Sequence, residues 1–293
     1  MIDKPAGITS SRVVEKLRRS VGAKAGHAGT LDPLATGVLP IALGEATKTV
    51  QFVSAGRKRY RFRIRWGLAT DTEDSEGAVI DESAARPDAA SIAAALPRFT
   101  GTVMQRPPAY SALKVAGRRA YALARAGRPP ELAPRPVEIA RLCLVAVIDP
   151  DHADFEAAVG VGTYIRALAR DLAEALGTRG HIAELRRLSV GRFDEMQAIS
   201  LDSALALGHS LAASEHLLPI ETALDDIPAL ALTATEAARL RHGQRVRPED
   251  AGERTRLDHL QDGMIVGARH QQRLVALARI EAGGLRPVRV INR

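Results

Sequence analysis

Apolar and charged residues alternate strictly between positions 59 and 66, which predicts a β-strand with one buried face. The apolar set is Tyr60, Phe62, Ile64 and Trp66, and the charged set is Arg59, Arg61, Arg63 and Arg65. Tyr60 is therefore expected on the inward face, whereas the arginines face solvent or a ligand. Two further apolar segments, residues 137–148 and 155–161, predict two more strands.

Apolar residues at intervals of three and four predict helices in other parts of the chain. Val13, Val14 and Leu17 would share one face of the first helix. The expected helices are residues 10–22 with Ser10 or Ser11 as cap and Gly22 at the end, residues 88–97 started by Asp88, and residues 120–126. Strands and helices therefore occur in the same part of the chain, as in an α+β domain.

A further helix is predicted after Thr163. Its apolar positions are Ile165, Leu168, Leu172 and Leu176, with Thr163 as the expected cap and Gly177 after its end. The first turn then contains Tyr164 and Arg166. A cation is unfavourable there, because the helix dipole prefers an anion at its N-terminal end. Arg166 should therefore have a carboxylate or phosphate partner from elsewhere in the chain or from a ligand.

The C-terminal part of the chain is expected to form a separate module. Residues 201–227 are predicted to be helical or irregular, and we place a boundary at Pro228. The features beyond it are a capping box at Thr233 and Glu236, a helix end at Gly243, and short alternating runs at residues 264–268 and 274–280. We therefore expect a larger domain at residues 1–227 and a small β-rich domain at residues 228–293.

The composition is that of an ordinary globular protein. The chain has 293 residues, 46% of them hydrophobic and only 3% aromatic, so its core must consist mostly of Leu, Val, Ile and Ala. The strongly apolar run at residues 142–148 is far too short to cross a bilayer, and the first residues lack the apolar core of a signal peptide. Cys143 is the single cysteine, so no disulfide within the chain and no cysteine metal site are expected. These features predict a cytoplasmic protein.

Positive charge is concentrated in one segment. The chain has 41 Lys and Arg residues against 34 Asp and Glu residues, a net charge of +7. Residues 98–135 alone contain eight basic residues and one acid, Glu131. The segment contains Pro107-Pro108 toward one end and Pro129-Pro130 toward the other, which predicts an inserted basic arm. Such an arm either binds a polyanion through phosphate contacts or is a solvated, arginine-rich surface.

One carboxylate, Asp32, lies in the glycine- and threonine-rich segment GHAGTLDPLATG at residues 26–37. Glycine and proline predict an irregular loop for residues 26–44. An isolated Asp before Pro most often starts a turn and caps its own backbone. No second acid, cysteine or metal-ligand cluster lies beside Asp32 in the sequence. Its chemistry therefore depends on what the rest of the chain brings to it.

The segment GHAGTLDPLATGVLP at residues 26–40 resembles the signature loop of the TruB family, the bacterial tRNA pseudouridine-55 synthases. A motif of this length is far more specific than a short glycine pattern. Further matches occur in the family's order: DKPAG at 3–7, GEATK at 44–48, KRY at 58–60, TDT at 70–72, QRPPAYSALK at 105–114, GTYIR at 162–166 and LRRL at 185–188. The resemblance covers residues 3 to about 190, and the C-terminal module is similar in position and size to the family's PUA-like domain.

The resemblance implies an α+β fold, the pseudouridine synthase fold, with a mixed, mainly antiparallel central sheet flanked by helices. Residues 1–227 would be the catalytic domain, and residues 228–293 a β-rich, PUA-like RNA-binding domain. The implied activity is that of an isomerase, which converts uridine 55 in the T-loop of tRNA to pseudouridine. No cofactor and no metal are implied, because the uracil is both leaving group and returning nucleophile. The implied partner is the tRNA T-stem-loop, bound by a monomer without membrane contact.

The resemblance also implies roles for individual residues. Asp32 would be the catalytic carboxylate, acting on the ribose or on the uracil ring, and Arg166 its ion-pair partner. Tyr60 would stack on the target uracil. The residues implied in substrate binding are Leu188 and Tyr164 at the uracil pocket, His27 inserted into the RNA fold, Lys4 as support of the catalytic loop, and Tyr110 and Lys114 in the RNA clamp.

Two departures and two alternatives accompany this interpretation. The family has a short apolar strand before the Lys-Pro motif, whereas this chain starts at Met1-Ile2-Asp3, so either the strand is shortened or the true start lies upstream. Val161 stands before Gly162 where the family commonly has a lysine. One alternative is a non-catalytic RNA-binding or tRNA-folding protein. Such a protein would keep the fold of the family but need not keep Asp32, Tyr60 and Arg166. A glycoside hydrolase would need a second carboxylate opposite Asp32.

Overall fold

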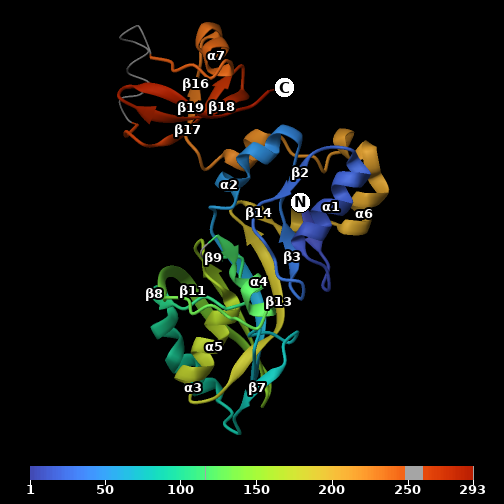
Figure 1. Ribbon diagram of the computed structural model, residues 1–293, viewed down its shortest axis with the longest axis vertical. Helices are drawn as coiled ribbons and strands as arrows, with labels where there is room; N and C mark the ends of the chain where they lie inside the picture. Colours follow the sequence, from blue (N-terminus) through green and yellow to red (C-terminus); the bar gives the residue numbers. More distant parts are fainter. Residues whose placement is uncertain (116, 248–259, 293) are drawn as a thin grey trace. The chain divides into compact units, whose positions relative to one another are not determined.

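The computed structural model describes residues 1–115, 117–247 and 260–292 (Figure 1). Contacts group the chain into two compact units. The first unit comprises Met1–Val13, Thr30–Leu39 and Ser54–Leu201, and the second comprises Val14–Gly29, Pro40–Val53 and Asp202–Arg293. The domain limits expected from the sequence, residues 1–227 and 228–293, stay a prediction.

The first unit is built on a mixed, mainly antiparallel sheet, to which the described residues contribute nine strands in the order β15-β1-β3-β13-β5-β12-β11-β8, with β14 on β13. The strands are β1 (Ile2–Lys4), β3 (Thr36–Leu39), β5 (Lys58–Trp66), β8 (Gly101–Gln105), β11 (Arg135–Asp149), β12 (His152–Val159), β13 (Gly180–Val190), β14 (Phe193–Asp194) and β15 (Ile199–Ser200). β1 pairs in parallel with β15, as β3 does with β13, and the other pairs are antiparallel. The expected α+β fold is confirmed.

The alternating segment forms the predicted strand β5 and supplies the core of this sheet. Its apolar side chains are at most 7% exposed, whereas Arg59, Arg61 and Arg65 are exposed. On the neighbouring strand, Phe155 pairs with Phe62 in register, and their rings stack with centroids 5.5 Å apart. The period-two pattern therefore identified both the strand and its buried face.

Helices form at the positions predicted from the sequence (Figure 1). They are α1 (Ser10–Val21), α3 (Ala89–Ala95) with the 3-10 turn η2 (Leu96–Phe99), α4 (Ala120–Arg125) and α5 (Ile165–Ala175). α5 packs on β13, and α3 and η2 pack against β11. The buried face of α5 includes Leu168 and Leu172, as its spacing predicted.

Of the N-caps predicted for the first three long helices, two were wrong and one was right. The Thr9 hydroxyl accepts the Arg12 N–H, so α1 is capped one residue before Ser10. α5 has Tyr164 at its N-cap position without a side-chain cap bond, and Thr163 instead donates to the Glu138 carbonyl. Asp88 does cap α3, by accepting the Ser91 N–H at 2.7 Å.

The prediction of an irregular loop at residues 26–44 was wrong in part. β2 (Ala25–His27) pairs with β4 (Ile41–Leu43), and β3 lies between them in the sequence. The 3-10 turn η1 (Gly44–Thr49) and α2 (Val50–Val53) follow. Strands of three or four residues carry too few alternating positions to be recognised from the sequence. Within this region, residues 28–35 and Pro40 lack regular structure.

The remaining small elements are two hairpins and a helical connection. β6 (Leu68–Thr70) pairs with β7 (Val79–Glu82), and β9 (Lys114–Val115) pairs with β10 (Arg118–Arg119). The connection comprises the 3-10 turn η3 (Glu195–Gln197), α6 (Leu201–Leu207), and the 3-10 turns η4 (Gly208–Ala213) and η5 (Ile220–Leu224). Residues 201–227 are thus helical and irregular, as expected.

The second unit contains the small β-rich module (Figure 1). Its sheet has the order β16 (Ala229–Ala231), β17 (Ile265–His270), β18 (Arg273–Glu281) and β19 (Gly284–Val290). The helix α7 (Ala234–Arg241) packs on these strands and begins at the predicted capping box of Thr233 and Glu236. β19 was not predicted, because Pro287 and its charged neighbours interrupt the alternation. Among the described residues, no helix has both the length and the apolar character needed to span a bilayer.

Candidate active site

Asp32 and Arg166 form a bidentate ion pair. Arg166 Nε donates to Asp32 Oδ2 at 2.9 Å, and Nη2 donates to Oδ1 at 3.1 Å. The Arg166 side chain is 4% exposed, whereas that of Asp32 is 32% exposed. One side of the carboxylate is therefore held by a buried guanidinium while the other side stays open. This pair provides the anionic partner that the position of Arg166 in the first turn of α5 predicted.

Three further groups surround the guanidinium of Arg166. Nη1 donates to the Thr72 carbonyl at 2.7 Å, and Nη2 donates to the Tyr110 carbonyl at 2.8 Å. Asp74 Oδ2 lies 3.6 Å from Nε. Burial alone would lower the pKa of Arg166, but the carboxylates of Asp32 and Asp74 outweigh it and raise that pKa. Arg166 therefore keeps its charge and its orientation.

Asp74 is a member of the site that the sequence analysis missed. Its side chain is buried, and it accepts the Thr72 hydroxyl at 2.6 Å and the Glu76 N–H at 3.1 Å. Both contacts depend on a tight turn in which Glu73 has a φ of 63°. Asp74 binds the same guanidinium as Asp32 instead of facing Asp32 across an open space. This arrangement does not supply the opposed carboxylates of a glycoside hydrolase.

The loop that carries Asp32 is held on both sides by buried polar groups. Lys4 is fully buried, and its Nζ donates to the carbonyls of Pro5, Ile8 and Pro33 at 2.8, 2.7 and 3.1 Å. Burial lowers the pKa of Lys4 to about 8. Ser10 Oγ donates to the Leu31 carbonyl and accepts its N–H. The neighbours of Asp32 on either side, Leu31 and Pro33, are thus held by side chains of the first unit.

Tyr60 and Leu188 lie on the paired strands β5 and β13. Tyr60 is 7% exposed and is the register partner of Arg187. The register shifts between Arg187 and Ser189, which leaves Leu188 as the extra residue of a β-bulge. Leu188 is half-buried. Bulges of this kind redirect a side chain and often lie beside active sites.

Tyr164 and Tyr110 are positioned at the edge of the ion pair. The guanidinium of Arg135 lies 5.5 Å from the centre of the Tyr164 ring, within range of a cation–π interaction. The Tyr110 hydroxyl donates to Asp71 Oδ2 at 3.3 Å, while its carbonyl binds Arg166. Tyr110 therefore belongs to the surroundings of Arg166 as well as to the basic arm.

Lys114 lies in the β9–β10 hairpin of the basic arm. It is directly opposite Arg119 in register, and Arg118 is adjacent. All three side chains are exposed. Like charges directly opposite each other destabilise a hairpin, and an anionic ligand would remove that cost. The hairpin thus has the charge pattern of an anion-binding surface.

His27 belongs to strand β2 of the second unit. It pairs with Ile41 in register and is half-buried. Within the described residues, no group of three or more His, Cys, Asp or Glu side chains is arranged to hold a metal ion.

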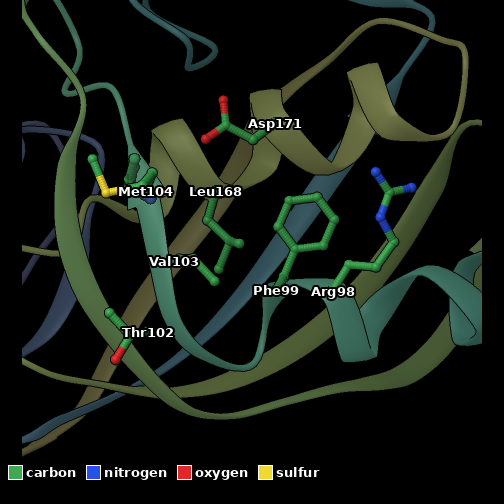
Figure 2. A pocket seen from close by; sticks show the side chains of 8 residues that line it. Arg98, Phe99, Thr102, Val103, Met104, Leu168 and Asp171 are labelled. Carbon is green, nitrogen blue, oxygen red and sulfur yellow. The ribbon is translucent and has the colours of Figure 1, made fainter.

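A separate pocket of about 310 Å³ lies beside α5 (Figure 2). Leu168 and Asp171 reach it from α5, and Thr102, Val103 and Met104 reach it from β8. Its lining is completed by Arg98, Phe99 and Gln105. It includes neither Asp32 nor Arg166, so it is distinct from the ion pair.

The whole fold is found in a solved structure described as "Structure of H/ACA RNP bound to a substrate RNA containing 2'-deoxyuridine". The TM-score is 0.73 at 22% identity, over 100% of this chain and 84% of that chain. Residues 16–165 match the family model described as TruB family pseudouridylate synthase (N terminal domain). Residues 166–225 match that of the tRNA pseudouridylate synthase B C-terminal domain. These matches define the class as pseudouridine synthases.

Relatives place the chain more narrowly. It is 55% identical over 292 residues to tRNA pseudouridine synthase B of Rhodospirillum rubrum, and the aligned region covers 99% of this chain and 95% of that relative. It is 54% identical over 300 residues to the protein of the same name from Bradyrhizobium diazoefficiens, and that alignment covers 100% of this chain and 85% of the relative. The chain belongs to the TruB family of tRNA pseudouridine synthases, isomerases that act on uridine in tRNA. The family resemblance seen in the sequence is confirmed.

Proposed function

We propose that this chain converts uridine 55 in the T-loop of tRNA to pseudouridine and that Asp32 is the catalytic carboxylate. The observation that carries the proposal is the bidentate pair, in which Arg166 is 4% exposed and Asp32 is 32% exposed. A fixed, charged guanidinium pairs with Asp32 and directs it, while the open side of the carboxylate remains available to a substrate.

The reaction breaks the bond between ribose C1' and uracil N1 and forms a bond between C1' and uracil C5. The proton on C5 is lost, and N1 gains one, so the base is isomerised without an external reactant. Asp32 acts at the start of this sequence, by attack on the ribose, attack on the uracil ring, or removal of a ribose proton. Its negative charge is required in all three cases. The proposal therefore includes no cofactor and no metal.

Other side chains take supporting roles in this proposal. Tyr60 stacks on the extruded uracil, and Leu188, redirected by its bulge, forms an apolar wall of the uracil site. Lys4 holds the loop of Asp32 through Pro33. Tyr164 lines the uracil site and supports the start of α5. His27 enters the RNA fold at the place that the flipped uracil has left. The contacts it makes there offset part of the few kcal/mol that base flipping costs.

The basic arm would bind the T-stem of the tRNA. Lys114 and its exposed neighbours in the hairpin contact phosphates, and Tyr110 joins this clamp. Contacts of this kind set the position of the RNA and do not read its sequence. The β-rich module at residues 228–293 adds a second RNA contact, as a PUA-like domain would. We place the activity in the cytoplasm, in a monomer that binds one tRNA.

The site of modification is tested with transcripts of defined sequence. An unmodified tRNA transcript labelled with tritium at C5 of every uridine is incubated with the protein, and released tritium is measured. We expect release equal to one uridine per tRNA, and none from a transcript that carries cytidine at position 55. Equal release from both transcripts, or none from a correctly folded wild-type transcript, would contradict the proposed target.

A further inference from the structure

Gln105 is the last residue of β8 and lies within the basic arm. Its side chain is 2% exposed, and both of its polar atoms bind the backbone of Tyr164. Oε1 accepts the Tyr164 N–H at 2.8 Å, and Nε2 donates to the Tyr164 carbonyl at 3.1 Å. A buried side-chain amide that binds both the backbone N–H and the carbonyl of one residue fixes the position and the orientation of that residue's backbone.

Tyr164 is the residue on which the start of α5 depends. It occupies the N-cap position, its own side chain makes no cap bond, and its carbonyl accepts the Leu168 N–H at 3.0 Å. Arg166 follows two residues later. The Gln105 side chain therefore satisfies the N–H of the N-cap residue, one of the groups left open at the start of a helix, and it does so from a strand about 60 residues away in the sequence.

The other end of the basic arm holds the same turn. Arg135 is the register partner of Gln105 on β11. Its Nη2 donates to the Gly162 carbonyl at 2.8 Å, and its guanidinium lies 5.5 Å from the Tyr164 ring centre. These two paired strand residues thus both contact the segment just before Arg166.

We propose that Gln105 is a positioning residue for the isomerisation, which holds the first turn of α5 so that Arg166 meets Asp32 in bidentate geometry. Through Gln105, the base of the RNA-binding arm is linked to the catalytic pair. The inference rests on the proposed function of Asp32 and Arg166. A reacting group displaced by about 1 Å costs on the order of a hundredfold in rate, so the loss of this contact should affect the rate of the reaction.

The substitution Gln105→Met removes both hydrogen bonds at nearly constant volume. Single-turnover tritium release with enzyme in excess gives the rate constant, and filter binding gives the Kd for tRNA. We expect the rate constant to fall by roughly tenfold to a hundredfold while the Kd stays within about threefold of wild type. The matched control is Thr102→Val, an exposed position on the same strand, which should leave both values unchanged.

A double-mutant cycle then tests whether Gln105 acts through Arg166. In the background of Arg166→Lys, which has already lost the bidentate pair, Gln105→Met should slow the reaction further by less than about threefold. An equal loss in both backgrounds would overturn the inference. So would a single-variant rate within threefold of wild type, or a Kd that rises in proportion to the fall in rate.

Failure of the inference can be told from failure of the proposed function. If Asp32→Asn and Arg166→Lys lose activity but Gln105→Met does not, only the inference fails. If Asp32→Asn remains active, the proposed function fails whatever Gln105 does. Should Gln105→Met not fold, Gln105→Glu keeps the acceptor for the Tyr164 N–H, and a slower rate at unchanged Kd is again expected. Loss of folding in both variants would assign Gln105 to stability alone and overturn its positioning role.

Discussion

Arg166 shows how one side chain can be fixed from several parts of the backbone. Its donors are shared between the Asp32 carboxylate and the carbonyl groups of Thr72 and Tyr110. A planar fork with donors on both sides can satisfy these partners at once, whereas an ammonium group cannot. The direction in which Asp32 is held is therefore set by backbone atoms as well as by charge.

The sequence predicted this pair but not its surroundings. The helix dipole required an anion near Arg166, and the family resemblance pointed to Asp32. Asp74 was indistinguishable from Asp71 and Glu73 in the sequence, because its burial depends on the turn geometry at Glu73. Gln105 was hidden for a similar reason. Its contact with Tyr164 exists only once two distant segments are packed together.

Lys58 provides a test of how the first unit tolerates a buried cation. It is 9% exposed, and its Nζ donates to the carbonyls of Ser54 and Gly56. Burial lowers its pKa to about 8, against about 10.4 in an unfolded chain. Between these values the unfolded state binds more protons than the folded state, so this group makes stability rise with pH.

We therefore expect the free energy of unfolding of wild type, relative to Lys58→Met, to increase by about 2 kcal/mol between pH 8 and pH 10. Below pH 7 the difference should be constant, because Lys58 is then protonated in both states. Urea unfolding of the two proteins across this range measures it. A difference that stays flat from pH 8 to pH 10, or that falls, would contradict the lowered pKa.

At the scale of elements, the contact between β3 and β13 determines where the Asp32 loop ends. Gly37 pairs with Arg187 in this parallel contact and has a φ of 99°. A Cβ atom at Gly37 would lie 2.2 Å from the Arg187 carbonyl oxygen. Both the backbone conformation and the close approach thus require glycine at this position. The glycine-rich character of the loop has a packing cause here.

We expect Gly37→Ala to lower the free energy of unfolding by about 3 kcal/mol or more, because strands β3 and β13 must separate. Gly177→Ala is the control. Gly177 has a φ of 70° but no atom within 4 Å of an added Cβ, so only the conformational cost of about 1 kcal/mol applies. Denaturant unfolding compares the two. Similar losses in both variants would show that the β3–β13 contact is not the cause.

Elements were predictable in proportion to their length and regularity. β5 has several alternations of apolar and charged residues, and α5 has several helical turns with apolar residues on one face, so the sequence located both. β2 and β4 have three residues each and were missed, because their pairing with each other defines them. The caps failed for a different reason. Thr163 has the right side chain for an N-cap, but its hydroxyl donates to the Glu138 carbonyl, and Tyr164 occupies the N-cap position with its backbone held by Gln105.

At the scale of the whole molecule, binding of tRNA by the basic arm requires contacts between the arm and RNA phosphates. Each phosphate contact contributes about 0.7 to 0.9 to the slope of log K against log salt. Replacing Lys114, Arg118 and Arg119 with alanine should therefore weaken tRNA binding and reduce that slope by about two to three. Filter binding between 50 and 300 mM salt measures it.

The matched control removes the same charge from the outward face of β5. Arg59, Arg61 and Arg65 lie on the side of the sheet opposite Tyr60, and the first two are within 4 Å of Glu156 and Asp154. Replacing these three arginines with glutamine should change the slope of log K against log salt by no more than about one relative to wild type. If both triple variants change the slope equally, binding depends on net charge and the arm is not a specific clamp.

The most direct measurement of the central claim is tritium release by Asp32→Asn. This substitution keeps the shape of the side chain and removes its charge. With enzyme in excess over a tRNA transcript labelled at uridine C5, we expect release at least about a thousandfold slower than wild type, with the Kd for tRNA within a few-fold. Release within tenfold of the wild-type rate would contradict the assignment of Asp32 as the catalytic carboxylate.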